Sequence, residues 1–391
     1  MKYIFKLFFL IASFILNPLQ GNPLFSAEKE IKVYLIGTGV VGSALLDQIK
    51  NNKEKLYHTP DIDINIVGLA NSQKMAFSDQ GIDLNNWKKI LNESEKRFSI
   101  SKFINHIDAE THPVFVDCTS NKEIANAYAS ILQKHISIVT PNKKANSGNY
   151  SSYRLLKELS QENQVKYIYD SNVGAGLPIL STIRGLLNSG DDIIRIEAIL
   201  SGTLSYLFNH FDENTPFSSL VMDAQKKGYT EPDPRDDLNG MDVARKILII
   251  AREIGAKNLE LGDVDLTAFL PDDCFTASSV AEFYSKLKDY DATFEEIRKQ
   301  ADKEGKKLRF IASYENHFID ATWSAKPHGK LAVSLQAVDK DHPFYNLSGN
   351  DNIISIHTKY YTNPIVIKGP GAGADVTAAR VYEGIISARK L

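Results

Sequence analysis

The stretch from Ile31 to Lys50, IKVYLIGTGVVGSALLDQIK, constrains the fold more than any other part of the chain. An apolar segment precedes a glycine turn, and a helical pattern of apolar residues follows it. In a dinucleotide-binding fold, such glycines permit the tight bend, let a pyrophosphate approach the backbone, and let helix and strand pack closely. The freed amides at the helix start then bind phosphate. The alternative is a glycine turn in another kind of α/β protein. The motif predicts cofactor contacts from Gly37, Thr38, Gly39, Val40, Val41 and Gly42.

Three more segments have the pattern of buried strands. They are INIVGLANS (64–72), PVFVDCTS (113–120) and HISIVTPNKKA (135–145). Ligands bind beyond the carboxyl ends of parallel strands, so we expect Ala70, Thr119 and Lys143 to line the cofactor crevice. For Thr119 the alternative is a helix N-cap, with Glu123 completing a capping box. For Lys143 the alternative is a solvated loop lysine.

The end of the first of these segments carries information about the cofactor. A cofactor without a 2′-phosphate usually meets an Asp or Glu at this point. Here the residues from Ala70 to Lys74, ANSQK, contain no carboxylate and end in a lysine. The pattern favours NADPH, although NADH is not excluded. The separation between Gly42 and this strand exceeds the usual spacing. We therefore expect residues 50–63 to form an insertion or a longer helix and loop.

The bulk composition limits the classes of function. With 391 residues the chain is too long for one ordinary compact core, so we expect two domains. A net charge of −3 argues against a nucleic-acid surface and for a small-molecule or protein partner. The two cysteines, Cys118 and Cys274, cannot form a disulfide framework, and no Cys/His spacing matches a zinc site. These features indicate a reducing compartment.

The N-terminus does not fit that picture. Residues 1–16, MKYIFKLFFLIASFIL, resemble a secretory signal and are too short for a membrane span. Ser26 and Ala27 follow, but Phe25 stands where a cleavage site requires a small residue. The alternatives are an amphipathic anchor or upstream coding sequence. We therefore leave residues 1–30 out of the fold prediction.

Residues 228–246, GYTEPDPRDDLNGMDVARK, concentrate charge before the apolar stretch ILIIA. The two prolines predict a fixed loop without regular helix. Asn239 is the expected N-cap of a helix beginning at Gly240, with Asp242 reaching back as in a capping box. Asp242 and Lys246 are i,i+4 neighbours on this largely buried helix. Asp236 is expected to be purely structural, paired with Arg235.

A buried pair of charges is either a structural ion pair or a functional site. Residues with shifted pKa values cluster at functional sites, and this loop brings more carboxylates than one ion pair needs. Rigid carboxylates can bind a substrate ammonium, while a lysine can give a proton to a nascent alkoxide. We therefore favour a site. The turn VGAGLP (173–178) could offer carbonyl oxygens to a cation, but on the sequence alone the start of a helix is favoured.

Several motifs together closely resemble homoserine dehydrogenase. They are GTGVVGSALLDQ, VDCTS, TPNKKA, VGAGLP, SGTLSYLFN, GYTEPDPRDDLNGMDVARK and GPGAGADVTAARV, and they span residues 31–391 in the family's order. The match is to the short form, without a C-terminal amino-acid-sensing domain or a fused aspartate kinase. The resemblance implies reversible, NAD(P)-dependent interconversion of L-aspartate 4-semialdehyde and L-homoserine, in threonine and methionine biosynthesis.

The resemblance also implies roles for individual residues. Lys246 would donate the proton, and Asp242 would bind and orient substrate or water. Lys143 would lie between nicotinamide and substrate. The amino acid would be bound by Glu231, with Asp237, Tyr229 and Thr203 lining the pocket. A sodium ion would be held, largely by backbone carbonyls, at Asp170, Val173, Ala175 and Leu177. Some members of the family have Glu at the position of Asp170.

The family's architecture sets the expected domains. Residues 31–170 and 369–391 would form a Rossmann-type domain, completed by the C-terminal helix with Gly373 close to the cofactor. Residues 171–368 would form an inserted α+β catalytic domain with a mixed sheet, which also makes a homodimer interface. Because the enzyme needs a supply of NADPH, a cytoplasmic location is expected.

Two other functions compete with this one. Aspartate-semialdehyde dehydrogenase uses a related substrate but needs a cysteine nucleophile, and neither Cys118 nor Cys274 lies near Lys246 in the sequence. A catalytically silent NADPH-binding sensor would not need the Asp242–Lys246 pair.

Overall fold

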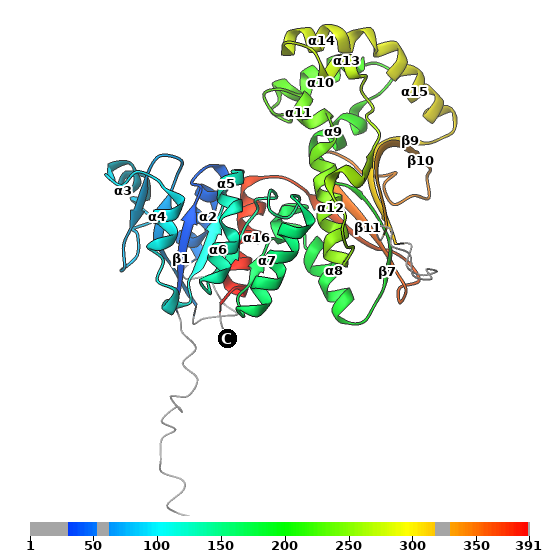
Figure 1. Ribbon diagram of the computed structural model, residues 1–391. Coiled ribbons are helices and arrows are strands. Elements are labelled where there is room, and N and C mark those ends of the chain that lie inside the picture. The colour runs from blue at the N-terminus through cyan, green and yellow to red at the C-terminus, as the bar shows by residue number, and fades with distance from the viewer. Residues whose placement is uncertain (1–29, 53–61, 317–328, 390–391) are drawn as a thin grey trace, which may run out of the picture.

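The computed structural model describes residues 30–52, 62–316 and 329–389. In this part of the chain two six-stranded β-sheets lie side by side, each with its own helices (Figure 1). The predicted fold class, a nucleotide-binding α/β domain joined to a domain with a mixed sheet, is confirmed. The signal-like segment 1–29 and most of the predicted insertion at 50–63 lie outside the described residues. Within those residues no helix is long and apolar enough to cross a membrane.

The first sheet has the strand order β3-β2-β1-β4-β5-β6. All its strands run parallel except β3. The bounds are β1 (Glu30–Ile36), β2 (Asp63–Ala70), β3 (Met75–Phe77), β4 (Val114–Asp117), β5 (Ser137–Val139) and β6 (Tyr167–Ile168). The order changes direction at β1 and β4, so the carboxyl ends of these strands border the crevice in which such sheets bind ligands.

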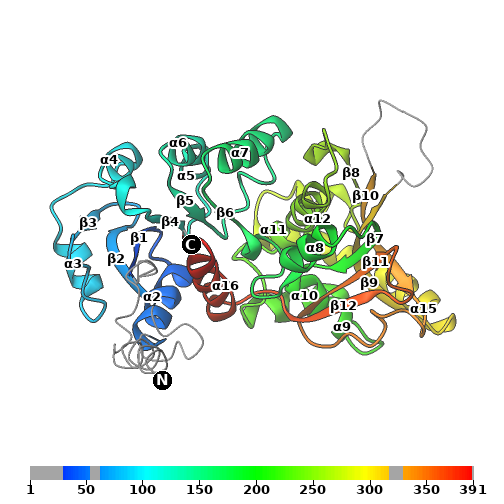
Figure 2. The same cartoon turned by 90° about the horizontal axis from the view of Figure 1, so that it is seen from below.

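Helices cover both faces of this sheet, as buried parallel strands require. On one face α2 (Val40–Asn52) lies beside the C-terminal helix α16 (Ala374–Ser387), blue and dark red in Figure 2. On the other lie α5 (Lys122–Asn126), α6 (Tyr128–Gln133) and α7 (Tyr150–Glu162). The remaining helices here are α3 (Trp87–Glu93), α4 (Ile100–Asn105) and the 3-10 turn η2 (Ala109–Thr111). The chain thus returns at its end to complete the first domain.

The second sheet has the order β12-β11-β7-β9-β10-β8. It is mixed, because β8 runs parallel to β10 while the other neighbours are antiparallel. Its strands are β7 (Ile193–Ile199), β8 (Val264–Leu266), β9 (Lys307–Glu315), β10 (Lys330–Val338), β11 (Asp351–Thr358) and β12 (Ile365–Pro370).

Helices of the second domain cover one face of this sheet and extend beyond it (Figure 1). They are α8 (Ile179–Asn188), α9 (Gly202–His210), α10 (Phe217–Lys226), α11 (Arg235–Leu238), α12 (Met241–Ile254), α13 (Asp272–Phe275), α14 (Val280–Asp289) and α15 (Asp291–Lys303), with 3-10 turns η3 (Asp170–Asn172) and η4 (Leu261–Asp263). The central helix, α12, packs on β9, β10 and α8. Its run from Ile247 to Ala251 is fully buried, which explains the apolar sequence.

The local predictions for residues 232–242 need correction. The N-cap of α12 is Gly240, with φ of 71°, and not Asn239. Glycine has no side chain with which to cap the helix. The Asn239 side chain, one residue earlier, accepts a hydrogen bond from the Met241 amide at 2.8 Å. The predicted loop contains the short helix α11, because Pro234 is tolerated before a first turn. Arg235 pairs with Asp233, at 2.5 Å, and not with Asp236.

The structure does not support the alternative reading of Thr119 as a helix N-cap. The N-cap of α5 is Asn121, whose side chain accepts hydrogen bonds from the amides of Glu123 and Ile124. The Thr119 hydroxyl accepts one from the Asn121 amide at 3.1 Å. Thr119 therefore lies before the helix, at the edge of the predicted crevice.

Candidate active site

The glycine turn after β1 has the geometry of a dinucleotide site. Gly37 has φ of 95°, and a Cβ there would lie 2.7 Å from the Thr119 methyl group. A Cβ on Gly42 would lie 1.9 Å from the Gly37 carbonyl oxygen, so these two glycines are required for packing. Gly39 differs, because a Cβ there would meet nothing within 4 Å. Its backbone faces open space, where a pyrophosphate can approach the start of α2.

The end of β2 lies next to this turn, since the Gly37 amide donates to the Ala70 carbonyl at 2.9 Å. Beyond Ala70, the Asn71 side chain accepts hydrogen bonds from the amides of Gln73 and Lys74, at 2.8 Å each. A side-chain turn thus occupies the position where a ribose-binding carboxylate would stand.

A buried network that the sequence analysis missed positions the next two strand ends. Asp117, the last residue of β4, is fully buried. Its carboxylate accepts hydrogen bonds from Tyr128 at 2.6 Å, from the Asn142 side chain at 2.9 Å and from the Thr119 amide at 2.7 Å. Burial raises the pKa of Asp117, and these hydrogen bonds oppose the shift. The network fixes the loops that carry Thr119 and Lys143.

Lys143 connects the two domains. Its ammonium lies 2.9 Å from Asp242 Oδ1, and the other carboxylate oxygen lies 2.7 Å from Lys246 Nζ. Lys246 also donates a hydrogen bond to the Leu200 carbonyl at 2.6 Å. Lys143 follows β5 in the first domain, whereas Asp242 and Lys246 begin α12 in the second. The Asp242–Lys246 ion pair therefore lies at the carboxyl edge of the nucleotide-binding sheet.

Burial and neighbouring charges alter the pKa values of this pair. Burial lowers the pKa of the Lys246 ammonium below its ordinary value, and the Asp242 carboxylate opposes that shift. Burial alone would raise the pKa of Asp242, but Lys246 and Lys143 outweigh it and hold the pKa well below its usual range. Only 10% of the Lys246 side chain is exposed. Asp242 is thus ionised at neutral pH, and Lys246 releases a proton more readily than a solvated lysine.

A second polar group lies around the start of α9. The Thr203 hydroxyl is 2.7 Å from the Tyr229 carbonyl and 3.1 Å from Asp237 Oδ1. The other Asp237 oxygen accepts a hydrogen bond from the Glu231 amide at 2.7 Å. Burial raises the pKa of Asp237, and the negative charge of Glu231 adds to the shift. The structure therefore brings these four predicted substrate-binding residues together.

The group of Lys143, Asp242 and Lys246 lies close to the group around Asp237. The charge of Asp242 contributes to the raised pKa of Asp237, and Asp237 in turn favours the charged form of Lys246. A cluster of acidic groups beside an ammonium that can exchange its proton matches a substrate that carries both an amine and a hydroxyl.

The predicted cation loop joins the two domains. Ala175 has φ of 52°, and the Leu177 amide donates to the Gly174 carbonyl at 2.9 Å. Among the described residues, no donor bonds to the carbonyl oxygens of Val173 or Ala175. The Asp170 carboxylate binds two arginines, and its carbonyl accepts a hydrogen bond from the Val173 amide at 3.5 Å. No cluster of three or more His, Cys, Asp or Glu side chains suited to a metal occurs in the described ranges.

The glycine turn before α16 returns to this region. Gly373 has φ of 131° and precedes α16 directly. A Cβ on Gly176 of the cation loop would lie 2.8 Å from the Val376 carbonyl. Both chain crossings between the domains therefore pack against each other.

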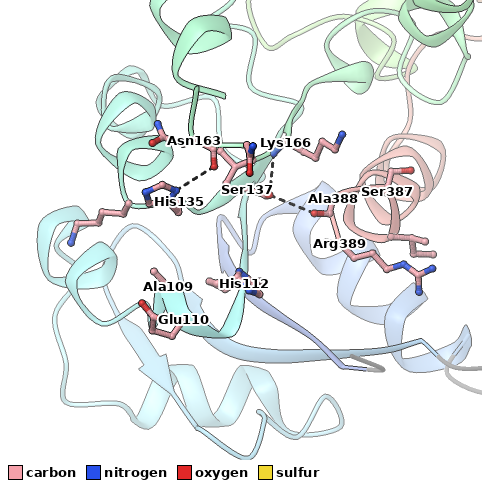
Figure 3. A pocket seen from close by; sticks show the side chains of 15 residues that line it. Ala109, Glu110, His112, His135, Ser137, Asn163, Lys166, Ser387, Ala388 and Arg389 are labelled. Carbon is pink, nitrogen blue, oxygen red and sulfur yellow. Dashed lines mark hydrogen bonds between the residues drawn. The ribbon is translucent and has the colours of Figure 1, made fainter. Parts of the chain in front are cut away.

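A large cavity of about 780 Å³ lies elsewhere, at the amino ends of β4, β5 and β6 (Figure 3). Exposed residues such as His112, His135 and Lys166 line it, and none of the predicted site residues does. Parallel sheets bind ligands at the opposite edge. The candidate site is therefore the edge that carries Lys143, Asp242 and Lys246, because charged side chains of both domains meet there.

Comparison with known proteins identifies the family. The model of the homoserine dehydrogenase family matches residues 178–386, and the model of its NAD-binding domain matches residues 37–170. The chain belongs to the homoserine dehydrogenase family. The Schizosaccharomyces pombe homoserine dehydrogenase is 38% identical, over 92% of this chain and 96% of its own length. A bifunctional aspartokinase/homoserine dehydrogenase of Zea mays is 42% identical, over 93% of this chain.

This chain spans 39% of that bifunctional relative's length. Among solved structures, a Candida auris protein of unknown function is 35% identical with a TM-score of 0.83, covering 92% of this chain and 98% of that one. A hyperthermophilic archaeal homoserine dehydrogenase in complex with NADPH is 22% identical with a TM-score of 0.66, covering 92% and 97%. The second likeness concerns the fold alone.

Proposed function

We propose that this protein interconverts L-aspartate 4-semialdehyde and L-homoserine with a nicotinamide cofactor, in the pathway to threonine and methionine. The observation that carries the proposal is the contact of Lys143 with Asp242, because it joins the Asp242–Lys246 pair to the loop that follows β5 in the nucleotide-binding domain. When bound, the cofactor supplies or accepts the hydride.

Lys246 moves the proton in this reaction. In the reductive direction its ammonium donates a proton to the oxygen of the semialdehyde carbonyl as the alcohol forms. In the oxidative direction its neutral amine accepts the proton from the homoserine hydroxyl. Asp242 holds the Nζ atom in place from 2.7 Å, and the lowered pKa of Lys246 suits it to both directions.

Glu231 and Asp237 bind the substrate ammonium. The Glu231 side chain is exposed, and the Asp237 carboxylate is partly buried against the Thr203 hydroxyl. Tyr229 lines the same pocket and stacks on Tyr206 with a centroid distance of 4.3 Å. This arrangement leaves negative charge beside the catalytic lysine, where an α-amino group would neutralise it.

The cofactor fits at the glycine turn. Gly37 to Gly42, with Ala70, Thr119, Lys143 and Gly373, would hold it, and the open space at Gly39 supports pyrophosphate binding. NADPH is preferred over NADH in our proposal, because Asn71 and not a carboxylate follows Ala70. Such an enzyme needs a cellular supply of reduced cofactor, which supports a cytoplasmic location.

Two further parts of the proposal rest mainly on the family resemblance. A sodium ion would be held by the carbonyls of the 170–177 loop, and the unbonded oxygens of Val173 and Ala175 support this. Hard cations take such oxygen ligands. A homodimer formed through the second domain is the expected assembly.

A mechanism with a cysteine nucleophile, as in aspartate-semialdehyde dehydrogenase, is disfavoured. Burial raises the pKa of the Cys118 thiol, and it raises that of Cys274 to about 11. Cys274 is fully buried. A nucleophilic cysteine needs the opposite shift and access to substrate.

The test is a spectrophotometric assay with L-homoserine and each of NADP and NAD. The proposal expects reduction of both cofactors to be dependent on homoserine, and faster with NADP at low cofactor concentration. Cofactor binding without turnover would favour a sensor. Activity that requires phosphate and is lost in Cys274→Ala would favour aspartate-semialdehyde dehydrogenase.

A further inference from the structure

The catalytic helix α12 touches the nucleotide-binding domain at both ends. At its start, Asp242 meets Lys143. At its other end, Arg252 and Glu253 make a second set of contacts, and both residues are buried, at 2% and 9% exposure. Neither belongs to the substrate or cofactor groups described above. Burying such charges is costly unless each is paired or hydrogen-bonded.

Arg252 binds the same short loop that carries the active-site lysine. Its Nη1 atom donates hydrogen bonds to the carbonyls of Asn146 and Gly148, at 2.7 Å each. The Lys143 carbonyl accepts hydrogen bonds from Ser147, so residues 143–148 form one compact turn. This turn therefore contacts the first turn of α12 through Lys143 and the last turn through Arg252.

The other contacts of Arg252 extend this junction. Its Nε and Nη2 atoms donate to the Leu259 carbonyl, and Nη2 lies 3.2 Å from the exposed Glu260 carboxylate. The hydroxyl of Tyr153, in α7 of the first domain, donates to the Arg252 carbonyl at 3.2 Å. A single guanidinium thus satisfies three backbone carbonyls from both domains, which a lysine cannot do.

Glu253 joins the junction to the chain crossing. Its carboxylate accepts a short hydrogen bond from the Tyr169 hydroxyl and pairs with Arg184 Nη1 at 2.9 Å. Arg184 also binds Asp170, at 2.5 Å, and Asp170 binds Arg380 of α16 at 2.9 Å. The charged chain therefore runs from the end of α12 to the first crossing between the domains, at Asp170, and on to α16 of the first domain.

We infer that Arg252 and Glu253 are positioning residues that fix α12 against the cofactor-binding turn and so set the place of Lys246 relative to the nicotinamide. This inference rests on the proposed function. Lys246 lies less than two helical turns before Arg252, so a tilt of α12 displaces its ammonium. Hydride and proton transfer are sensitive to such changes, since a misplacement of about 1 Å can lower the rate by about 100-fold.

The test compares Arg252→Lys and Tyr153→Phe with wild type and with Arg298→Lys as matched control. Arg298 is buried to a similar degree, at 8%, but its ion pairs with Glu295 and Asp302 stay within α15. Tyr153→Phe removes the hydrogen bond to the Arg252 carbonyl and the 3.5 Å contact with the Tyr169 hydroxyl but keeps the ring, so it supplies a variant that folds if Arg252→Lys does not. For each protein, kcat, KM for homoserine, the Kd of NADPH, the Tm and the deuterium isotope effect on hydride transfer are measured.

We expect kcat of Arg252→Lys to fall by about tenfold or more. The kcat of Tyr153→Phe should fall less. Both variants should show a larger deuterium isotope effect on hydride transfer, with the Kd of NADPH nearly unchanged. Arg298→Lys should lower the Tm alone. A lower Tm with unchanged kcat and isotope effect in both junction variants would overturn the inference. Wild-type protein without homoserine turnover would instead overturn the proposed function.

Discussion

At the residue scale, the proposed mechanism depends on a buried ammonium whose pKa is lowered. Lys246 is held by one carbonyl and one carboxylate, and it shares that carboxylate with Lys143. Removing water from an ammonium disfavours the charged form, while the nearby Asp242 favours it. The balance of these two effects sets the pH at which the lysine can act.

The first prediction concerns this balance. Homoserine oxidation needs neutral Lys246, so the rate should rise as pH rises through the pKa of this residue. Asp242→Asn removes a charge that stabilises the ammonium and should move that rise to lower pH. Lys143→Gln removes a charge that destabilises it and should move the rise to higher pH. The measurement is log kcat against pH; shifts in the same direction for both variants would contradict the assignment.

A second residue-scale prediction concerns Glu231. Glu231→Ala should raise KM for homoserine by about tenfold, the loss expected for one charge-assisted contact of about 1.4 kcal/mol. The Kd of NADPH should not change, because Glu231 lies beside Asp237 and not at the glycine turn. Steady-state kinetics with varied homoserine provide the measurement. Glu231→Gln is the control for shape, and an unchanged KM in Glu231→Ala would remove the proposed role.

At the element scale, the strand–turn–helix unit of β1 and α2 divides its glycines between folding and binding. A Cβ on Gly42 would overlap the Gly37 carbonyl, whereas a Cβ on Gly39 would enter open space. The apolar strand and the glycine spacing predicted this unit correctly, since both are local features of the sequence.

This division predicts opposite outcomes for two small substitutions. Gly39→Ala should fold with a nearly unchanged Tm but raise the Kd of NADPH by about tenfold or more, because the methyl group occupies the path of the pyrophosphate. Gly42→Ala should lower the Tm by several degrees, because helix and strand must separate. Thermal unfolding and cofactor titration measure the two effects. Unimpaired NADPH binding by Gly39→Ala would contradict the position of the cofactor.

At the scale of the whole molecule, two domains meet around one helix. The i,i+4 spacing of Asp242 and Lys246 predicted their ion pair, which the structure contains. The contacts of Asp117 with Asn142, and of Arg252 with Asn146, join residues 25 and 106 positions apart, and no local pattern predicts such pairs. The caps at Gly240 and Asn121 lie one and two residues after the positions considered from the sequence, a difference typical of helix boundaries. The proposed substrate comes from the family resemblance and not from the spacing alone.

The most direct test of the account is catalysis by Lys246→Ala. Hydride transfer from NADPH to L-aspartate 4-semialdehyde is followed in a single turnover, with NADPH binding and Tm measured on the same sample. The account predicts a folded protein that binds NADPH normally and transfers hydride at least about 100-fold more slowly than wild type. Transfer within a few-fold of the wild-type rate would contradict the role of Lys246.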